Sequence, residues 1–234
     1  SRGLGDVYKR QLCRHGQSEW NAKNLFTGWA DVNLSEQGIE EATAAGKKVL
    51  ENQLEIDVAF TSLLTRALET TQYILAQSKQ QWIPVYKSWR LNERHYGALQ
   101  GLNKDDARQQ FGEEQVHQWR RSYDIQPPAE SEEQRNEYLK NRRYRHLDHR
   151  MMPYSESLKD TLERVVPIWT DQISQHLLDD KTVLVSAHGN SIRALIKYLE
   201  NVSDEDIIGY EIKTGAPLVY ELTDELEVKD KYYL

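Results

Sequence analysis

The feature that most constrains this chain is a four-residue pattern that occurs twice, as His15-Gly16-Gln17-Ser18 and as His188-Gly189-Asn190-Ser191. The second copy follows an apolar run at 182–187 and precedes an amphipathic stretch at 192–199, which indicates a strand, a tight turn and a helix. Two such turns at the carboxyl ends of neighbouring parallel strands bring two imidazoles to the crevice where open α/β sheets bind ligands. Helix N-termini in that crevice favour phosphate, so the repeat predicts an anion-binding site.

Strand-like and helix-like patterns alternate along the chain, which predicts an α/β fold: a three-layer sandwich with a mostly parallel central sheet flanked by helices. Ser35 is typical of a helix N-cap, and the apolar periodicity after it predicts a helix to about Asn52. Pro167 should kink or break a long helix over 157–177. The other expected elements are strands at 58–60, 84–86, 182–187 and 218–220, the last an edge strand, and helices at 64–75 and 192–199.

The amino terminus departs from this pattern. A strand that leads to His15 in mid-sheet should be nearly continuous apolar sequence, yet residues 9–11 read Lys-Arg-Gln. We therefore predict that residues 1–11 are a foreign or non-native segment, left by cloning or by a sequence-assembly join. Residues 12–234 are expected to form a single domain, a size that allows a full core.

A second unusual segment lies at 127–150. It is polar throughout, with acidic residues first and then Arg142, Arg143 and Arg145. Two interpretations remain open, a solvated insertion and a mobile lid over the site.

Composition narrows the class of protein. The hydrophobic fraction is 38%, and no apolar run approaches the roughly 20 residues that cross a bilayer. A formal net charge of −7 disfavours generic binding to nucleic acid or to an anionic membrane, so an anionic substrate needs a local cationic pocket. The single cysteine, Cys13, rules out an internal disulfide and fits a reducing cytoplasm. The seven histidines show no metal-ligand spacing, and we expect no metal.

Six motifs carry the chemistry, and together they identify a family. They are RHGQSEWN (14–21), FTGW (26–29), TSLLTRA (61–67), RLNERHYGALQGLNK (90–104), WRRSYD (119–124) and SAHGNSIRAL (186–195). At these residues the chain closely resembles the cofactor-dependent phosphoglycerate mutases of the histidine phosphatase superfamily. The resemblance is collinear from about Leu12 to Pro217, and the long central motif together with WRRSYD is far more specific than RHG alone.

Phosphoryl transfer needs an in-line nucleophile and strong stabilisation of the charge on the equatorial oxygens. Imidazole is a good nucleophile near neutral pH, and neighbouring arginines keep it neutral, so we assign His15 as the nucleophile that forms a phosphohistidine. Arg14, Arg66 and His188 are the candidates for the cationic or hydrogen-donating clamp on the phosphoryl group. Asn21 and the amides of Gly189 and Asn190 complete the cradle.

The resemblance supplies the remaining roles. Glu93 matches the family's acid/base residue, which moves a proton to and from the substrate hydroxyl. The second phosphate and the carboxylate of the substrate are expected on a further set of anchors, and the substrate end nearest the nucleophile on three more residues. By resemblance the anchors are Arg94, Tyr96, Lys104, Arg120 and Arg121, and the three residues are Ser18, Thr27 and Gly28.

The implied activity is an isomerase of glycolysis and gluconeogenesis that interconverts 3-phosphoglycerate and 2-phosphoglycerate. The resemblance implies 2,3-bisphosphoglycerate as primer and intermediate, a cytoplasmic location and a homodimer, with phosphoglycerates as the only expected partners. Related enzymes that mainly make the bisphosphate typically carry glycine at the position of Ser18, which favours the mutase. In some members a carboxyl-terminal tail closes over the site, and we expect this chain to end short of it.

Two alternatives stay open. One is a phosphomonoester phosphatase of the same superfamily, which has no need of a second anion anchor such as Arg120, Arg121 and Lys104. The other is a catalytically inactive, phosphoprotein-binding member, which has no need of a nucleophile.

Several other histidine, cysteine and tryptophan side chains are expected to stabilise the fold rather than to take part in the reaction. His95 is expected to be structural, and Cys13 a small buried hydrophobic residue. Trp82, Trp89 and Trp119 are expected in core and interface packing rather than in a platform for stacked bases.

Overall fold

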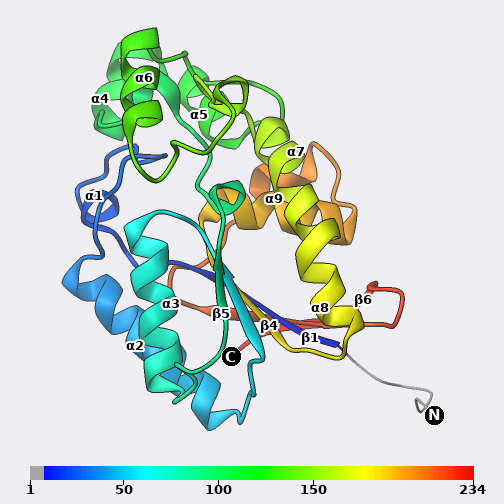
Figure 1. Ribbon diagram of the computed structural model, residues 1–234. Coiled ribbons are helices and arrows are strands. Elements are labelled where there is room, and N and C mark those ends of the chain that lie inside the picture. Colours follow the sequence, from blue (N-terminus) through cyan, green and yellow to red (C-terminus); the bar gives the residue numbers. More distant parts are fainter. Residues whose placement is uncertain (1–7) are drawn as a thin grey trace.

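The computed structural model describes residues 8–234, with side chains from Cys13 onward, and shows a six-stranded sheet between layers of helices (Figure 1). The strand order is β3-β2-β4-β1-β5-β6. Strands β1 to β4 are parallel to one another, and β5 runs antiparallel to both of its neighbours. The predicted α/β sandwich with a mostly parallel sheet is therefore confirmed. The strands are β1 (Tyr8–Arg14), β2 (Val58–Thr61), β3 (Val85–Lys87), β4 (Val183–Ala187), β5 (Pro217–Leu222) and β6 (Val228–Tyr233).

Helix α2 begins where the sequence places its cap. Ser35 accepts a hydrogen bond from the Gly38 amide at 3.1 Å and starts α2, as predicted. The helices are α1 (Glu19–Ala22), α2 (Glu36–Glu51), α3 (Thr65–Gln77), α4 (Lys104–Phe111), α5 (Glu113–Arg121), α6 (Glu132–Lys140), α7 (Leu158–Ile168), α8 (Ser174–Leu178) and α9 (Gly189–Glu200). Short 3₁₀ turns are η1 (Trp89–Leu91), η2 (Gly97–Leu99), η3 (His149–Met151) and η5 (Asp206–Gly209).

Each face of the sheet has its own apolar core. Alternate residues of a strand point to opposite faces, so in β4 Val183 and Val185 pack with residues of α7 to α9, while Leu184 packs with α2 and α3. Cys13 is fully buried in the second core, as expected for a small hydrophobic residue, and burial raises the pKa of its thiol to about 12. The two cores hold the sheet rigid beneath the site.

Pro167 disturbs the long helix before β4, as predicted. It lies inside α7, and the chain then passes through a π-helical turn, η4 (Trp169–Ile173), into α8. Proline lacks the N–H that the helical ladder requires, and a π-turn is a common way to absorb that loss.

The last part of the sheet differs from the sequence prediction. The strand expected at 218–220 forms as β5, but it lies between β1 and β6, so its assignment as an edge strand is wrong. The actual edge, β6, was not predicted. Its Lys229, Asp230 and Lys231 are exposed, and a charged edge strand has no apolar alternation to detect.

The predicted foreign segment is only partly visible. Residues 1–7 lie outside the described residues, while 8–11 belong to β1 and pair with β4 and β5 through their backbone. Whether residues 1–11 are native stays a prediction.

The polar segment at 127–150 contains α6 and packs against the domain. The Tyr144 ring is 3% exposed and stacks on Trp29 with centroids 5.1 Å apart. His95, expected to be structural, is fully buried, with Nε2 3.3 Å from a carboxylate oxygen of Glu130 in this segment. The insertion is therefore docked on the domain in this structure.

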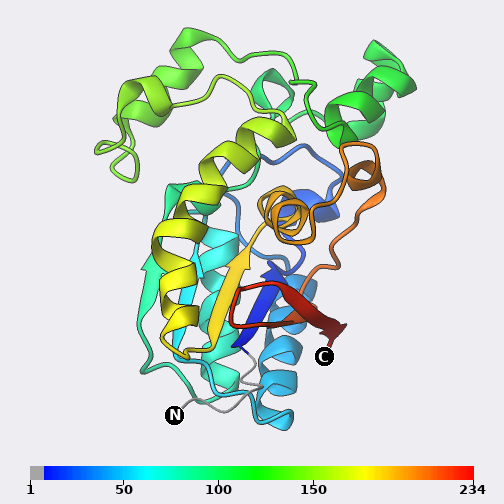
Figure 2. The same ribbon diagram turned by 90° about the vertical axis from the view of Figure 1, so that its right-hand side faces the viewer.

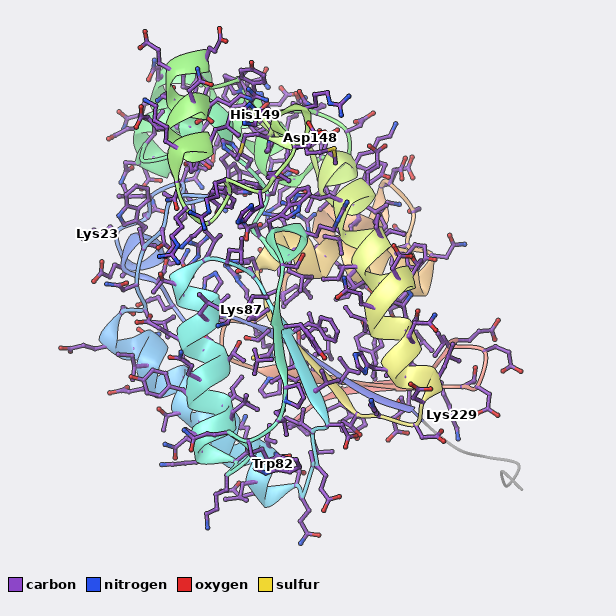
Figure 3. The ribbon with its side chains drawn as sticks, viewed as in Figure 1. Lys23, Trp82, Lys87, Asp148, His149 and Lys229 are labelled. Atoms are coloured by element: carbon purple, nitrogen blue, oxygen red, sulfur yellow. The ribbon has the colours of Figure 1, made fainter. Side chains whose placement is uncertain are left out.

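Trp82 does not lie in the core. It is 80% exposed, at the end of the molecule opposite His149 (Figure 3), because it follows a turn before the edge strand β3. No helix within residues 8–234 has both the length and the apolar character required to cross a bilayer.

Candidate active site

The two His-Gly turns lie side by side, as the repeat predicts. Arg14 at the end of β1 pairs with Ala187 at the end of β4, and His15 and His188 follow directly. The His15 amide donates to the Ala187 carbonyl at 3.0 Å, and the two imidazole centroids are 5.0 Å apart. Both strands point toward the end of the molecule where α4, α5 and α6 gather (Figure 2). The site thus lies at the carboxyl ends of the parallel strands.

His15 is held as a neutral imidazole. Its side chain is almost fully buried, and Nδ1 lies 2.6 Å from the carbonyl oxygen of Gly16. A carbonyl oxygen only accepts, so Nδ1 carries the proton and Nε2 keeps its lone pair. Burial, and then the charges of Arg66 and Arg14, lower the pKa of His15 well below its ordinary value. The Nε2 atom is therefore a ready nucleophile at neutral pH.

The glycine of each turn is closely packed, and Gly16 more tightly than Gly189. A Cβ added to Gly16 would lie 2.3 Å from the carbonyl oxygen of Gly38, at the start of α2. A Cβ on Gly189 would lie 3.3 Å from Nε of Arg14. Both glycines therefore let neighbouring groups approach the histidines.

His188 lies beside His15 and is also neutral. Its Nε2 is 2.7 Å from the hydroxyl oxygen of Ser62, and its Nδ1 is buried without a hydrogen-bond partner. Burial, followed by the charge of Arg66, lowers the pKa of His188 well below its ordinary value. The His188 imidazole was expected to be either cationic or hydrogen-donating. In the free protein it is therefore the neutral, hydrogen-donating form.

A cavity of about 170 Å³ opens over His15. Six cationic side chains line it, against the two carboxylates of Glu93 and Glu211. The cations are Arg14, Arg66, Lys104, Arg120, Arg121 and Arg193. The cavity is thus locally positive in a chain of net charge −7, as an anionic substrate requires.

Two guanidinium groups line the inner end of this cavity, that of the buried Arg66 and that of the partly buried Arg14. Arg66, in the first turn of α3, donates to the carbonyls of Gly28 at 2.7 Å and Ala30 at 2.9 Å, and Arg14 donates to Ile212 at 2.9 Å. The Nε–H groups of both arginines are buried without a partner. Burial lowers the pKa of Arg66 to about 10, which still leaves it charged at neutral pH. Both arginines therefore keep donors for an anion.

Glu93 faces the same cavity. It is 8% exposed, and its Oε1 accepts from the backbone amides of Arg94 at 2.7 Å and Asn190 at 3.2 Å. A carboxyl group fixed this way in the cavity that His15 also lines is suited to general acid–base catalysis.

The outer end of the cavity is more open. Lys104, Arg120 and Arg121 are partly exposed there, and burial lowers the pKa values of Lys104 and Arg120. The Tyr96 hydroxyl accepts a hydrogen bond from Nδ2 of Asn190 at 3.3 Å. Burial opposes its ionisation, but the adjacent Arg94 outweighs this and brings the pKa of Tyr96 down to about 8.

Comparison with known proteins places this site in a family. Residues 11–137 and 128–232 match the family described as "Histidine phosphatase superfamily (branch 1)". The chain belongs to the histidine phosphatase superfamily. It is 86% identical over 223 residues to a protein of Staphylococcus epidermidis named "2,3-bisphosphoglycerate-dependent phosphoglycerate mutase", covering 95% of this chain and 98% of that protein. A protein of the same name from Staphylococcus aureus is 84% identical, with the same coverage.

Solved structures of the superfamily share the fold. A phosphoglycerate mutase from Bacillus anthracis gives a TM-score of 0.70 at 20% identity, covering 98% of this chain and 93% of that one. A mycobacterial glucosyl-3-phosphoglycerate phosphatase also gives 0.70, at 21% identity and 97% coverage of both chains. At this identity the likeness shows the fold alone.

Thirteen of the sixteen residues predicted for this histidine phosphatase site line the one cavity. Three do not. His188 lies behind the cavity beside His15, and Arg94 is fully buried, donating to the Arg120 carbonyl at 3.0 Å. Ser18 caps α1, where its hydroxyl accepts from the Asn21 amide at 3.0 Å. The thirteen are Arg14, His15, Asn21, Thr27, Gly28, Arg66, Glu93, Tyr96, Lys104, Arg120, Arg121, Gly189 and Asn190.

Two charged residues of the cavity were not predicted from the sequence. Arg193 donates to the Asn190 side chain at 2.8 Å and to the Ile207 carbonyl at 2.7 Å. It follows Asn190 by three residues in α9, so helical spacing could have found it. Glu211 pairs with Arg121 at 2.7 Å from an irregular segment, which gives no sequence signal. Residues 8–234 contain no group of three His, Cys, Asp or Glu side chains arranged to hold a metal ion.

Proposed function

We propose that this protein is a 2,3-bisphosphoglycerate-dependent phosphoglycerate mutase, which interconverts 3-phosphoglycerate and 2-phosphoglycerate. The observation that carries the proposal is one cavity lined by His15 and Glu93 and also by the partly exposed cations Lys104, Arg120 and Arg121. A doubly phosphorylated intermediate needs a second anion anchor, whereas simple hydrolysis does not. Relatives that are 84% and 86% identical bear the same name, which supports the proposal.

His15 carries the phosphoryl group in the proposed reaction. Its Nε2 lone pair forms a bond to phosphorus while the bond from phosphorus to the ester oxygen breaks, and Glu93 gives its proton to that oxygen. In the return step the oxygen of a substrate hydroxyl attacks phosphorus and the bond from phosphorus to Nε2 breaks. Glu93 takes the proton of that hydroxyl. The proton and the phosphoryl group are thus both restored over the cycle.

Charge on the transferring group is stabilised by donors that need little reorganisation. The buried Nε–H groups of Arg14 and Arg66 and the Nδ1 atom of His188 have no protein partners. The N-terminus of α9, starting at Gly189, adds backbone N–H groups and a partial positive charge. Such preorganised donors are the main source of catalysis in phosphoryl transfer.

The side chains present fit 2,3-bisphosphoglycerate as primer. Besides the donors at the inner end, Thr27 lines the cavity and its Oγ1 is buried without a partner. A site with more buried donors than protein acceptors is suited to a polyanion. We propose that the bisphosphate phosphorylates His15 before the first turnover and that no metal ion takes part.

A direct test is isomer exchange with and without added 2,3-bisphosphoglycerate. We expect exchange to depend on the bisphosphate and to survive chelators. The alternative is a phosphomonoester phosphatase, a kind of enzyme also found among proteins of this fold. Release of phosphate from p-nitrophenyl phosphate without bisphosphate, and no isomer exchange, would favour that alternative.

We further propose a cytoplasmic enzyme of glycolysis and gluconeogenesis that binds phosphoglycerates and neither nucleic acid nor membrane. The assembly proposed is a homodimer, and the sheet ends at β3 and β6 leave strand edges that a second copy can cover. Light scattering at micromolar concentration should give twice the chain mass, and a monomer would exclude the dimer.

Two proposals concern segments of the single domain. The polar residues 9–11 in an interior strand support a non-native origin for residues 1–11, and resequencing the source DNA across Gln11 and Leu12 tests it. An uninterrupted native reading frame would overturn that origin.

We propose that 127–150 is a lid, in which case its amide hydrogen exchange should slow when substrate binds.

A further inference from the structure

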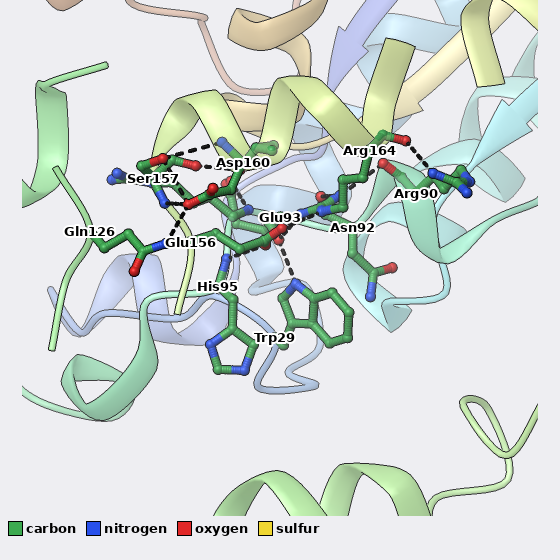
Figure 4. A network of polar contacts seen from close by, with 12 residues as sticks. Trp29, Arg90, Asn92, Glu93, His95, Gln126, Glu156, Ser157, Asp160 and Arg164 are labelled. Carbon is green, nitrogen blue, oxygen red and sulfur yellow. Dashed lines mark hydrogen bonds and ion pairs between the residues drawn. The ribbon is translucent and has the colours of Figure 1, made fainter. Parts of the chain in front are cut away.

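A buried polar network lies behind Glu93 (Figure 4). Its centre is Arg164 of α7, which pairs with Glu156, and both side chains are 5% exposed. Nε of Arg164 lies 2.6 Å from Oε2 of Glu156, and Nη2 lies 2.9 Å from Oε1. The contact is therefore a bidentate pair, the geometry in which guanidinium and carboxylate match best.

The same guanidinium also holds the backbone before Glu93. Nη1 of Arg164 donates to the carbonyls of Arg90 at 2.8 Å and Asn92 at 3.0 Å, and Nη2 donates to the carbonyl of Glu93 at 2.8 Å. With the two bonds to Glu156, these contacts match the five N–H donors of a guanidinium group. Three of the five donors thus go to one short stretch of backbone.

Glu156 holds the backbone on the other side. Its Oε1 accepts from the His95 amide at 2.9 Å, and its own amide donates to the His95 carbonyl at 2.8 Å. The indole of Trp29 adds a bond from Nε1 to the Glu93 carbonyl at 2.6 Å. The residues that flank Glu93 are therefore fixed by side chains from distant parts of the sequence.

The backbone around Glu93 forms no regular ladder of helix or sheet hydrogen bonds. The turn η1 ends at Leu91, and residues 92–96 are irregular, so their buried polar groups depend on such partners. The Glu93 carboxylate, in contrast, faces the cavity, where its Oε1 accepts only backbone amides. Its position therefore follows from the position of the backbone that carries it.

We infer that Arg164 and Glu156 are positioning residues that place the Glu93 carboxyl group for proton transfer to and from the substrate. This inference rests on the proposed mutase function. Proton transfer requires heavy atoms within hydrogen-bond reach, and a displacement of about 1 Å can cost on the order of a hundredfold in rate. The pair acts through the backbone and touches no substrate.

The test is R164K, which keeps the charge but has three donors in place of five. The mutase kcat should fall about ten- to a hundredfold while KM changes less than about threefold. The limb of the pH profile that reports the acid/base group should shift. Release of nitrophenolate from p-nitrophenyl phosphate should fall less, because this leaving group needs no proton.

A matched control is V165A, which removes buried core volume from the same helix and leaves every hydrogen bond of Arg164 and Glu156 to the backbone around Glu93 in place. E156Q is a second variant, which keeps an acceptor for the His95 amide but removes the charge. Amide hydrogen exchange of the peptide that covers residues 90–96 should rise in R164K and E156Q. It should stay unchanged in V165A at a matched loss of thermal stability.

The outcomes separate the two proposals. Wild-type protein without bisphosphate-dependent isomer exchange would overturn the mutase function and this inference with it. A normal wild type together with R164K and E156Q of unchanged kcat, pH profile and exchange would overturn the inference alone. The inference alone would also be overturned if V165A lowered the mutase kcat as much as R164K does.

Discussion

The inner and outer ends of the cavity differ in how they hold charge. At the inner end His15, Arg66 and His188 are at most 2% exposed, and burial is the first cause of the lowered pKa of each. At the outer end Arg121 keeps 22% of its side chain exposed and pairs with Glu211, which is 75% exposed. An exposed pair of this kind contributes little to stability and is easily exchanged. The inner end is therefore built for chemistry, and the outer end for reversible binding.

This contrast predicts that substitutions at the inner end lower kcat, whereas those at the outer end raise KM. The largest effect is expected for His15→Ala, because it removes the atom that carries the phosphoryl group. Mutase activity should fall by at least about 10⁴-fold in a coupled assay of 2-phosphoglycerate formation. His117→Ala, at an exposed position on α5, is the control and should retain wild-type activity. Substantial isomer exchange by the His15 variant would break the comparison at its inner end.

Glu93→Gln keeps the shape of the side chain and removes its proton transfer. We expect kcat to fall about 10²- to 10⁴-fold, with KM close to that of the wild type. Steady-state kinetics with 3-phosphoglycerate measures both constants. A variant that raises KM and keeps kcat would assign Glu93 to binding and contradict its proposed role.

Arg120→Ala tests the outer end. Loss of one charged hydrogen bond to the substrate, worth about 1.5–3 kcal/mol, should raise KM about ten- to a hundredfold and change kcat only a few-fold. Because the residue is partly exposed, added salt should raise the wild-type KM in the same direction. A large fall in kcat with unchanged KM would show that the two ends do not differ in the way described.

The smallest effect concerns stability at acid pH. The lowered pKa values of His15 and His188 mean that, below pH about 6.5, the unfolded chain binds protons that the folded chain does not. The free energy of unfolding should therefore fall as pH decreases, by up to about 1.4 kcal/mol per pH unit for each histidine. Urea titrations of wild type and His15→Asn should show a shallower decline in the variant. Equal slopes would mean that His15 titrates alike in both states.

The site was easier to predict than its supports. The repeated His-Gly turn marks His15, and Arg66 and Glu93 stand in contiguous motifs that resemble those of the phosphoglycerate mutases, so the sequence displays all three. Arg164 and Glu156 act on backbone carbonyls and amides, which any residue supplies, so no side-chain pattern marks them.

The fold shows the same division. Interior strands such as β4 are apolar runs that the sequence displays, whereas β6 is a charged edge whose pairing is made by backbone alone. Trp82 lies outside the core for a related reason, because a tryptophan in a turn gives no sequence signal of whether its indole is buried within the domain. Hydrophobic patterns in the sequence predict which side chains are buried. They do not predict contacts made by the backbone or the positions of exposed side chains.

The most direct test of the account is to incubate the protein with ³²P-labelled 2,3-bisphosphoglycerate and map the labelled peptide after trypsin digestion. Cleavage after Arg14 gives a peptide that starts at His15. The account predicts label on this peptide, lost in acid and kept in alkali, as for a phosphohistidine. Label that survives acid, or that lies on another peptide while isomer exchange proceeds, would contradict it.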